Sequence, residues 1–350
     1  MGFKQCSDSK VALSLKQFFL ILLVLSVVTQ GLRPVTLELI KNVYKYLDWL
    51  FHSYPPSVWL WLVSYSGGKD STTLLLLALS YAADKGFKVS IVYNDSGGDL
   101  PKLRGLVFEV LNAVKSNPKL LHAVGSVFVT RPNKTFFDYL LTKYSPPRWN
   151  FRWCCKRLKE YPFRRLVSEL AKERKVLNLV GNRSEEARWR SWLVKKVSDK
   201  VVYVAPLRDL RNDDVWHLLK TVSSQLGFEW VYRTLLDIYR GGAIKRSGCW
   251  FCTLTSPLNM LILEPEVLKI KLELLDAWCN NNRERIMELA KEHPELIHIT
   301  ITRDKISYGY PCGKKCDTCQ VGKLRSLLKK LVNQIVENSY NALRIAISNS

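Results

Sequence analysis

The chain has 350 residues, of which 47% are hydrophobic, enough to fill a sizeable core in one large domain or in a domain with appendages. It carries 53 Lys and Arg against 31 Asp and Glu, a formal net charge of +22, which favours polyanionic partners such as nucleic acid, nucleotides or anionic membranes. Seven of its nine cysteines lie in close clusters, a pattern typical of metal or redox chemistry rather than of the disulfide framework of a short secreted protein.

The first predicted element is an apolar run over residues 18–28, which follows three lysines. Eleven residues are short for a transmembrane span, although they match the core of a signal peptide. No clear cleavage site follows. We interpret residues 1–33 as a packed or membrane-leaning helix, as the product of a misplaced start codon, or as a true signal. Because nucleotide substrates are scarce outside the cell, we expect a cytoplasmic protein without a membrane partner.

Strands and helices alternate over the next two hundred or so residues. Helical spacing covers 34–52, a continuous apolar run at 58–63 predicts a buried strand, and a helix then runs to about residue 84, closed by Gly86. Further strands are predicted at 88–95, 125–130, 175–183 and 201–207, with a helix at 101–115. This pattern predicts an α/β fold with a doubly wound, mostly parallel sheet over residues 34–240. Residues 241–350 form an appended, cysteine-rich and mainly helical region.

A glycine-rich loop, SYSGGKDST at residues 64–72, separates the first predicted strand from its helix. Glycines let phosphate oxygens approach the backbone, and the start of a helix offers N–H groups and the positive end of its dipole. Lys69 supplies a counter-charge, while Asp70 could cap the helix or hold Mg²⁺. The spacing fits neither a Walker A loop nor a dinucleotide-binding loop. The predicted nucleotide ligands here are Ser66, Gly67, Gly68, Lys69, Asp70, Ser71 and Thr72.

Six segments, in order, resemble the phosphoadenosine phosphosulfate (PAPS) reductase family of the PP-loop superfamily, which includes DndC-type proteins of DNA phosphorothioation. They are SYSGGKDST (64–72), YNDSG (93–97), FRWCCKRLK (151–159), GNRSEEARWR (181–190), PLRDLRNDDVW (206–216) and SGCWFCT (247–253). One departure is Leu210, where the family has Trp. The resemblance covers roughly residues 58–255 and implies the PP-loop fold, a bound adenine nucleotide and a role in sulfur metabolism.

Polar residues after the predicted strands are candidate ligands. Arg183 and Arg188 have planar donors that suit phosphate or sulfate oxygens, with an ion pair to Glu185 or Glu186 as the alternative. Asp95 could hold a ribose hydroxyl or a metal, or be a turn residue before Gly97. Asn212 is interpreted as the N-cap of a helix with Asp213 and Asp214 in its first turn.

The cysteines allow several sites. Cys154, Cys155, Cys249 and Cys252 resemble the pattern that holds a [4Fe–4S] cluster in adenylylsulfate (APS) reductases. Zinc is an alternative, held by Cys249, Cys252 and two of Cys312, Cys316 and Cys319. A structural thiol or a disulfide is a third possibility.

Two chemistries use such a fold. APS and PAPS reductases attack sulfur with a cysteine in an E-C-G-x-H tail, whereas this chain ends LRIAISNS and has YPCGKKCDTCQ (310–320) as its nearest analogue. The other chemistry releases pyrophosphate from ATP to activate an oxygen that sulfur then replaces. We expect Lys69 and Asp70 to take part in catalysis, with Cys312, Cys316 or Cys319 carrying sulfur or, in a reductase, serving as the nucleophile.

The expected function is ATP-dependent sulfur transfer to nucleic acid, DNA or tRNA. A sulfur-donor protein such as a cysteine desulfurase is an expected partner. An APS or PAPS reductase is the first alternative, and a non-catalytic nucleic-acid-binding module that keeps a bound nucleotide is the second. Basic runs at 156–166 and 188–196 place charges beside aromatic residues, as in a polynucleotide groove or on a solvated helix face.

Overall fold

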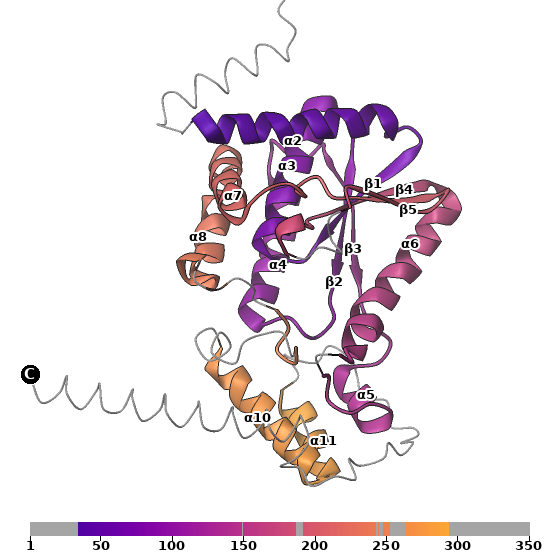
Figure 1. Ribbon diagram of the computed structural model, residues 1–350, viewed down its shortest axis with the longest axis vertical. Coiled ribbons are helices and arrows are strands. Elements are labelled where there is room, and N and C mark those ends of the chain that lie inside the picture. Colours follow the sequence, from indigo (N-terminus) through magenta and orange to yellow (C-terminus); the bar gives the residue numbers. More distant parts are fainter. Residues whose placement is uncertain are drawn as a thin grey trace, which may run out of the picture.

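The computed structural model describes residues 34–148, 150–186, 192–242, 244, 248–252 and 264–293. At its centre is a six-stranded sheet in the order β3-β2-β1-β4-β6-β5 (Figure 1). Neighbouring strands are parallel except for β5 and β6, which pair antiparallel. The strands are β1 (Trp59–Tyr65), β2 (Val89–Asn94), β3 (Val124–Thr130), β4 (Lys175–Val180), β5 (Val194–Ser198) and β6 (Val201–Val204). The predicted doubly wound α/β fold is confirmed.

Helices cover both faces of this sheet because its strands bury side chains on each side. Trp61 and Val63 of β1 face a large core shared with α3 (Lys69–Lys85), α4 (Pro101–Ser116) and α7 (Asn212–Leu226). Leu62, between them, points to the opposite face and packs in a smaller core under α6 (Tyr161–Glu173). Figure 1 shows α6 on one side of the sheet and α3, α4 and α7 on the other. A continuous apolar run is what such a doubly covered strand requires.

The remaining helices extend this frame. They are α2 (Pro34–Ser53), α5 (Phe136–Thr142), α8 (Glu229–Ile238), α10 (Pro265–Cys279) and α11 (Arg283–Glu292). Three short helices complete the set: the π-helix η1 (Cys155–Glu160) and the 3₁₀-helices η2 (Ser184–Glu186) and η4 (Arg240–Gly242). Helices α10 and α11 lie at the end of the molecule next to α5 (Figure 1). The described part of the C-terminal region is therefore helical, as predicted. In the described ranges, no helix is both long and apolar enough to cross a bilayer; residues 1–33 lie outside those ranges.

Strand β1 lies at the point where the chain reverses its direction across the sheet. From β1 the chain moves outward through β2 and β3, then returns to add β4 on the other side of β1. The loops that follow β1 and β4 therefore diverge and leave a crevice at the carboxyl edge of the sheet, where ligands bind in open α/β folds. The glycine-rich loop occupies this position.

Two local expectations need correction. Helix α7 does begin at Asn212, but its N-cap is Arg211, whose backbone N–H donates to Asp214 Oδ2 at 2.8 Å. Strand β5 was not predicted from the sequence. It is an exposed edge strand that carries Lys195 and Lys196, so it lacks the apolar pattern that reveals the buried strands.

Candidate nucleotide site and cysteine group

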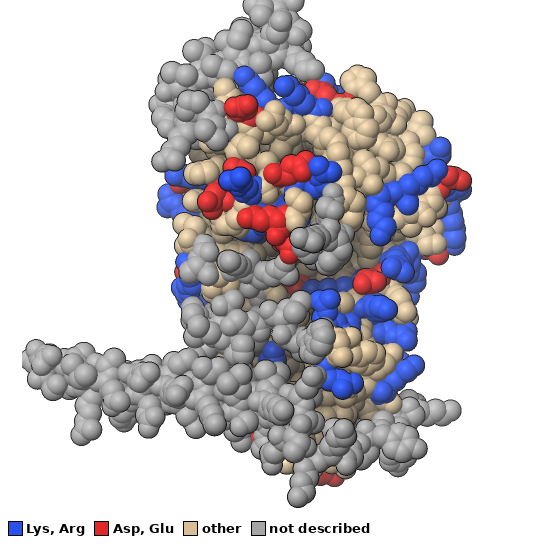
Figure 2. Space-filling model, in the orientation of Figure 1, with Lys and Arg blue, Asp and Glu red and all other residues tan. Residues whose placement is uncertain are grey.

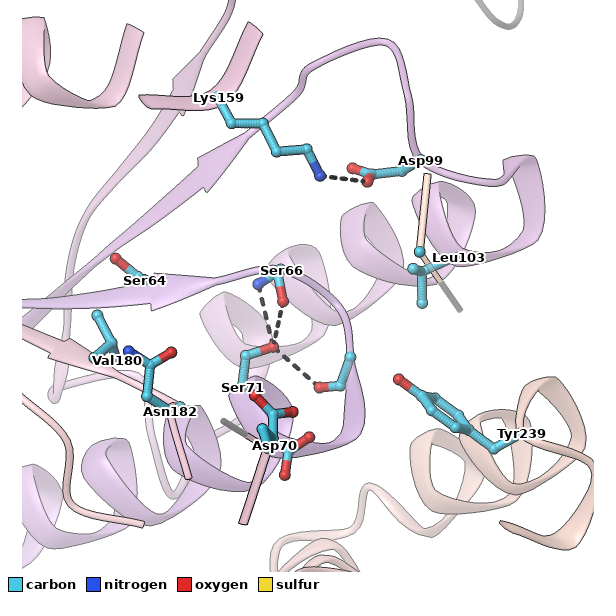
Figure 3. Close-up of a pocket in the computed structure, with 14 residues that line it drawn as sticks. Ser64, Ser66, Asp70, Ser71, Asp99, Leu103, Lys159, Val180, Asn182 and Tyr239 are labelled. Carbon is cyan, nitrogen blue, oxygen red and sulfur yellow. Dashed lines mark hydrogen bonds and ion pairs between the residues drawn. The ribbon is translucent and has the colours of Figure 1, made fainter. Parts of the chain in front are cut away.

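The glycine-rich loop is held in shape by its own serines. Ser71 Oγ accepts from the Ser66 backbone N–H at 3.2 Å, lies 3.1 Å from Ser66 Oγ and donates to the Gly68 carbonyl at 3.0 Å (Figure 3). Gly67 has φ +76°, and a Cβ there would collide with Val107, so only glycine fits. Gly68 is the N-cap of α3 and offers no side chain to cap it. The start of α3 is therefore suited to an anion.

A pocket of about 420 Å³ opens beside this loop, a volume typical of small-ligand sites. Its walls come from six places besides the loop: the end of β4 with the residues after it, the segment after β2, helix α4, helix η1, the residue after α8, and Gly248. The side chains that these places contribute include Val180, Asn182, Glu186, Asp99, Lys159 and Tyr239 (Figure 3). The pocket thus lies at the crevice that the strand order creates.

Gly181 brings the loop after β4 against the start of α3. A Cβ at this position would lie 3.1 Å from the backbone of Asp70 and of Ser71. Backbone cannot move aside as a flexible side chain can, so this close approach depends on glycine. Gly181 therefore fixes the width of the pocket between the two loops.

Asp70 is the centre of a charge network at the pocket. Its carboxylate accepts from Lys69 Nζ at 2.7 Å and from Arg183 Nε at 2.5 Å, and Arg183 Nη1 also reaches Glu185 Oε2 at 2.5 Å. Burial alone would lower the pKa of Arg183, but the Asp70 and Glu185 carboxylates outweigh it and raise that pKa. The ion-pair alternative for Arg183 is thus what the structure contains, with Asp70 as an additional partner. Arg188 lies outside the described residues.

Asp95 was expected to bind a ribose hydroxyl or a metal, or to be a turn residue before Gly97, but its carboxylate pairs with two arginines. It is buried, and its carboxylate accepts from Arg104 Nε at 3.1 Å, from Arg104 Nη2 at 3.0 Å and from Arg131 Nε at 3.1 Å. The carboxylate therefore orients two arginines near the end of β2, rather than facing the pocket.

Three predicted ligands of the loop, Gly67, Lys69 and Thr72, are not among the residues that line the pocket. Thr72 is fully buried and donates to the Gly68 carbonyl at 2.9 Å, inside the first turn of α3. Lys69 is also buried, with Nζ 5.7 Å from the centre of the Tyr239 ring. Sequence reasoning missed Asp99, Asn182 and Tyr239 as pocket residues. Lys159 was missed as well, although the quoted segment at 151–159 ends on it.

The pocket shares a wall with the cysteines. Lys159 Nζ lies 3.5 Å from Asp99 Oδ1 (Figure 3), and Asp99 forms a backbone bridge to Cys249. Trp250 secures this bridge, because its backbone N–H donates to Gly98 at 2.8 Å and its indole N–H to Gly97 at 3.1 Å. The Cys-x-x-C segment is therefore fastened to the loop that forms one side of the pocket.

Four cysteines gather behind that wall: Cys154, Cys155, Cys249 and Cys252. A hydrogen bond between the adjacent pair raises the pKa of Cys154 and lowers that of Cys155. Cys249 and Cys252 further raise the pKa of Cys154, so the other three thiols all act on this one. Burial raises the pKa of Cys249 to about 11, although Lys159 opposes it.

These thiols are not assembled as a metal site. Within the ranges that the structure describes, no three His, Cys, Asp or Glu side chains form a group that could hold a metal ion. The donor set nevertheless suits a soft metal, since it consists of four thiols. Cys312, Cys316 and Cys319 lie outside the described residues.

Comparison with known proteins identifies the domain. The phosphoadenosine phosphosulfate reductase domain model matches residues 61–254, and no curated protein matches the chain. NMN synthetase from Francisella tularensis is 14% identical with a TM-score of 0.40, the match covering 77% of this chain and 99% of that one. The U34-tRNA thiolase NcsA from Methanococcus maripaludis, with its [4Fe–4S] cluster, is 15% identical with a TM-score of 0.35, over 82% and 89%. We draw nothing further from these two distant similarities. The family match spans more than half of the 350 residues, and the chain therefore belongs to the phosphoadenosine phosphosulfate reductase domain family of the PP-loop superfamily.

Proposed function

We propose that this chain is an ATP-dependent sulfur-transfer enzyme that releases pyrophosphate and modifies nucleic acid. One observation carries the proposal: the anion-binding loop lines a pocket whose other lining residues include Asp99 and Lys159, which adjoin the cysteine group. Lys159 lines the pocket and pairs with Asp99, which is bridged to Cys249. A nucleotide held by its phosphates at the loop would extend toward the thiols, so activation and sulfur delivery could occur in one place.

The charges in the pocket favour Mg–ATP over APS or PAPS. Asp70 and Glu186 both line a pocket whose loop is otherwise suited to an anion. Lys69 and Arg183 offset part of the negative charge of Asp70. Mg²⁺ binds through one or two carboxylates plus substrate phosphates, so Asp70 and Glu186 could hold it beside the phosphates of ATP. When bound, Mg²⁺ would neutralise charge on the leaving pyrophosphate. The chain's own residues would hold the phosphates through the loop and the first turn of α3.

The proposed reaction has two steps. An oxygen of the nucleic acid attacks the α-phosphorus of ATP, the bond to the bridging oxygen breaks, and pyrophosphate leaves. A sulfur nucleophile, such as hydrosulfide or a protein persulfide from a cysteine desulfurase, then attacks the activated atom and AMP departs with the oxygen. With hydrosulfide, neither step needs an oxidant or a reductant. With a persulfide, a second protein thiol attacks the carrier sulfur of the resulting disulfide, which releases the thiolated product and leaves a protein disulfide for a thiol reductant to reopen.

The cysteine group is the proposed sulfur-handling site. Cys154, Cys155, Cys249 and Cys252 would provide the four thiolates that hold a [4Fe–4S] cluster, and Cys312, Cys316 or Cys319 would then carry the incoming sulfur. Zinc, held with Cys312, Cys316 or Cys319, is the alternative. Lys159 places a cation beside Cys249 and would favour its thiolate.

The test uses anaerobically purified protein with its iron counted and its visible spectrum recorded. The protein is incubated with ATP–Mg²⁺ and nucleic acid, and separately with APS or PAPS plus a thiol reductant. We expect pyrophosphate in the first reaction, stimulated by nucleic acid, and no sulfite in the second. Sulfite would establish a reductase, and neither product would indicate a non-catalytic binding module.

A matched pair of variants locates the activity. Asp70→Asn should lower pyrophosphate release by at least about a hundredfold, since a charge is lost where phosphate and cation meet. Asp199→Asn makes the same chemical change on an exposed turn far from the pocket and should leave the rate unchanged. Equal rates in the two variants would remove Asp70 from the mechanism.

A further inference from the structure

One short stretch of the chain holds a large share of its positive charge. Residues 143–165 contain eight Lys or Arg and one acidic residue, Glu160, whereas the whole chain has a net charge of +22 over 350 residues. Figure 2 shows basic side chains gathered on the face over α5 and α6, at the right of the view. Such a high density of positive charge attracts a polyanion and orients it during approach.

Aromatic rings alternate with these cations. We call the set Lys143, Tyr144, Arg148, Phe151, Arg157 and Tyr161 the basic–aromatic face. Arg157 links its parts: the guanidinium lies 5.0 Å from the Tyr161 ring centre and 6.0 Å from that of Tyr144, and Nε donates to the Tyr144 hydroxyl at 3.1 Å. Lys143 Nζ lies 5.6 Å from the Tyr144 ring, and the Phe151 ring lies 6.0 Å from it.

Two rings of this face are open to solvent. Phe151 is 42% exposed and Tyr161 is 45% exposed, so flat aromatic surface is available between the charges. Arginines hold phosphates, whereas exposed rings stack on bases that are not already paired. A duplex buries its bases and would leave these rings without partners. The combination therefore fits an unpaired stretch of nucleic acid.

The face is continuous with the candidate catalytic pocket. Helix η1 carries Arg157 on the face and Lys159, two residues later, in the pocket wall. A π-helix of this kind is rare and is frequently found at functional sites. A nucleic-acid strand bound across the face could therefore present one of its nucleotides to the pocket.

We propose that the basic–aromatic face binds an unpaired segment of a polynucleotide and leads it into the pocket. This inference rests on the proposed function, because it names the surface that receives the nucleic-acid substrate. Phosphates lie on Lys143, Arg148 and Arg157, and bases stack on Phe151 and Tyr161.

The experiment measures binding alone, by fluorescence anisotropy of short labelled oligo(U), oligo(dT) and a mixed-sequence duplex over a range of salt concentrations. The charge-reversal variant is Lys143→Glu with Arg148→Glu, both exposed and each assigned one phosphate. The matched control is Lys195→Glu with Lys200→Glu, which makes the same charge change on the β5–β6 hairpin. Thermal melting confirms that all variants are folded.

We expect the charge-reversal variant to bind single strands at least tenfold more weakly, with a salt slope shallower by about 1.4, or ~0.7 for each of two lost phosphate contacts. The control should bind like the wild type. Phe151→Ala should weaken binding to single strands by about fivefold or more and leave duplex binding unchanged. The oligo(U) and oligo(dT) arms decide whether RNA or DNA is preferred.

Equal binding by the two charge variants would overturn the proposal. Tighter binding of the duplex, unchanged by Phe151→Ala, would overturn the stacking of bases on the exposed rings. Pyrophosphate release without any polynucleotide binding would reject the face and leave the ATP chemistry standing. Binding on the face without pyrophosphate release would support the face and reject the proposed ATP chemistry.

Discussion

At the residue scale, Gly181 shows how a missing side chain shapes the candidate site. Gly181→Ala would place a Cβ 3.1 Å from the backbone of Asp70 and Ser71, and the glycine-rich loop would have to shift by a few tenths of an ångström. Because anion binding depends on the alignment of backbone donors, we expect roughly tenfold weaker ATP binding, measured by calorimetry, with little change in thermal stability.

Gly105→Ala is the matched control. Gly105 lies exposed within α4, and a Cβ there would meet nothing within 4 Å. Alanine is the better helix former, so this variant should gain roughly 0.5–1 kcal/mol of stability and bind ATP normally. Normal ATP binding by Gly181→Ala would show that the two loops do not define the site.

At the element scale, the Cys-x-x-C segment owes its position to packing as well as to hydrogen bonds. Phe251 stacks on Phe136 of α5, with ring centres 4.3 Å apart and an angle of 6° between the planes. Trp250 is fully buried and donates its indole N–H to Gly97. These contacts hold Cys249 and Cys252 near Cys154.

Trp250→Ala should therefore separate the cysteine group. Truncating a buried tryptophan costs about 3–5 kcal/mol, and part of that loss falls on the segment that holds two of the four thiols. We expect the iron content of anaerobically prepared protein to fall along with its melting temperature. Trp230→Ala is the control, since that ring on α8 is 36% exposed. Full iron content in Trp250→Ala would mean that the thiols do not depend on this anchor.

At the scale of the molecule, the sequence predicts what depends on short-range pattern. The buried strands and the glycine-rich loop can be predicted from the sequence alone, because apolar runs mark the strands and small polar residues interrupt them at the loop. The pairing of Arg183 with Glu185 was among the expectations from the sequence, because the two residues are neighbours in the chain. Its pairing with Asp70, and that of Asp95 with Arg131, could not be predicted, because the strand order brings these residues together. Tyr239 was missed for the same reason: it is far from the loop in sequence and meets it only after folding.

Alkaline stability is a property of the whole molecule. Burial is the largest cause that raises the pKa of Tyr44, Tyr46, Tyr65, Tyr81 and Tyr93, to about 12 for Tyr44 and higher for the others. Their ordinary pKa is 10.0, so above pH 10 the unfolded chain loses protons that the folded chain keeps. Stability is then complete below pH 10 and falls as the pH rises toward 12.

The slope follows from proton linkage. Each tyrosine that stays protonated in the fold lowers the free energy of unfolding by about 1.4 kcal/mol per pH unit in this window. Urea unfolding at a series of pH values should show a midpoint that falls steeply above about pH 10, beyond the loss that the raised pKa values of Cys154 and Cys249 cause above their ordinary value of 9.0. Tyr44→Phe removes one titrating hydroxyl and should make the fall shallower by about 1.4 kcal/mol per pH unit. A midpoint that stays level through pH 11 would mean that these hydroxyls titrate normally and that the core admits water around them.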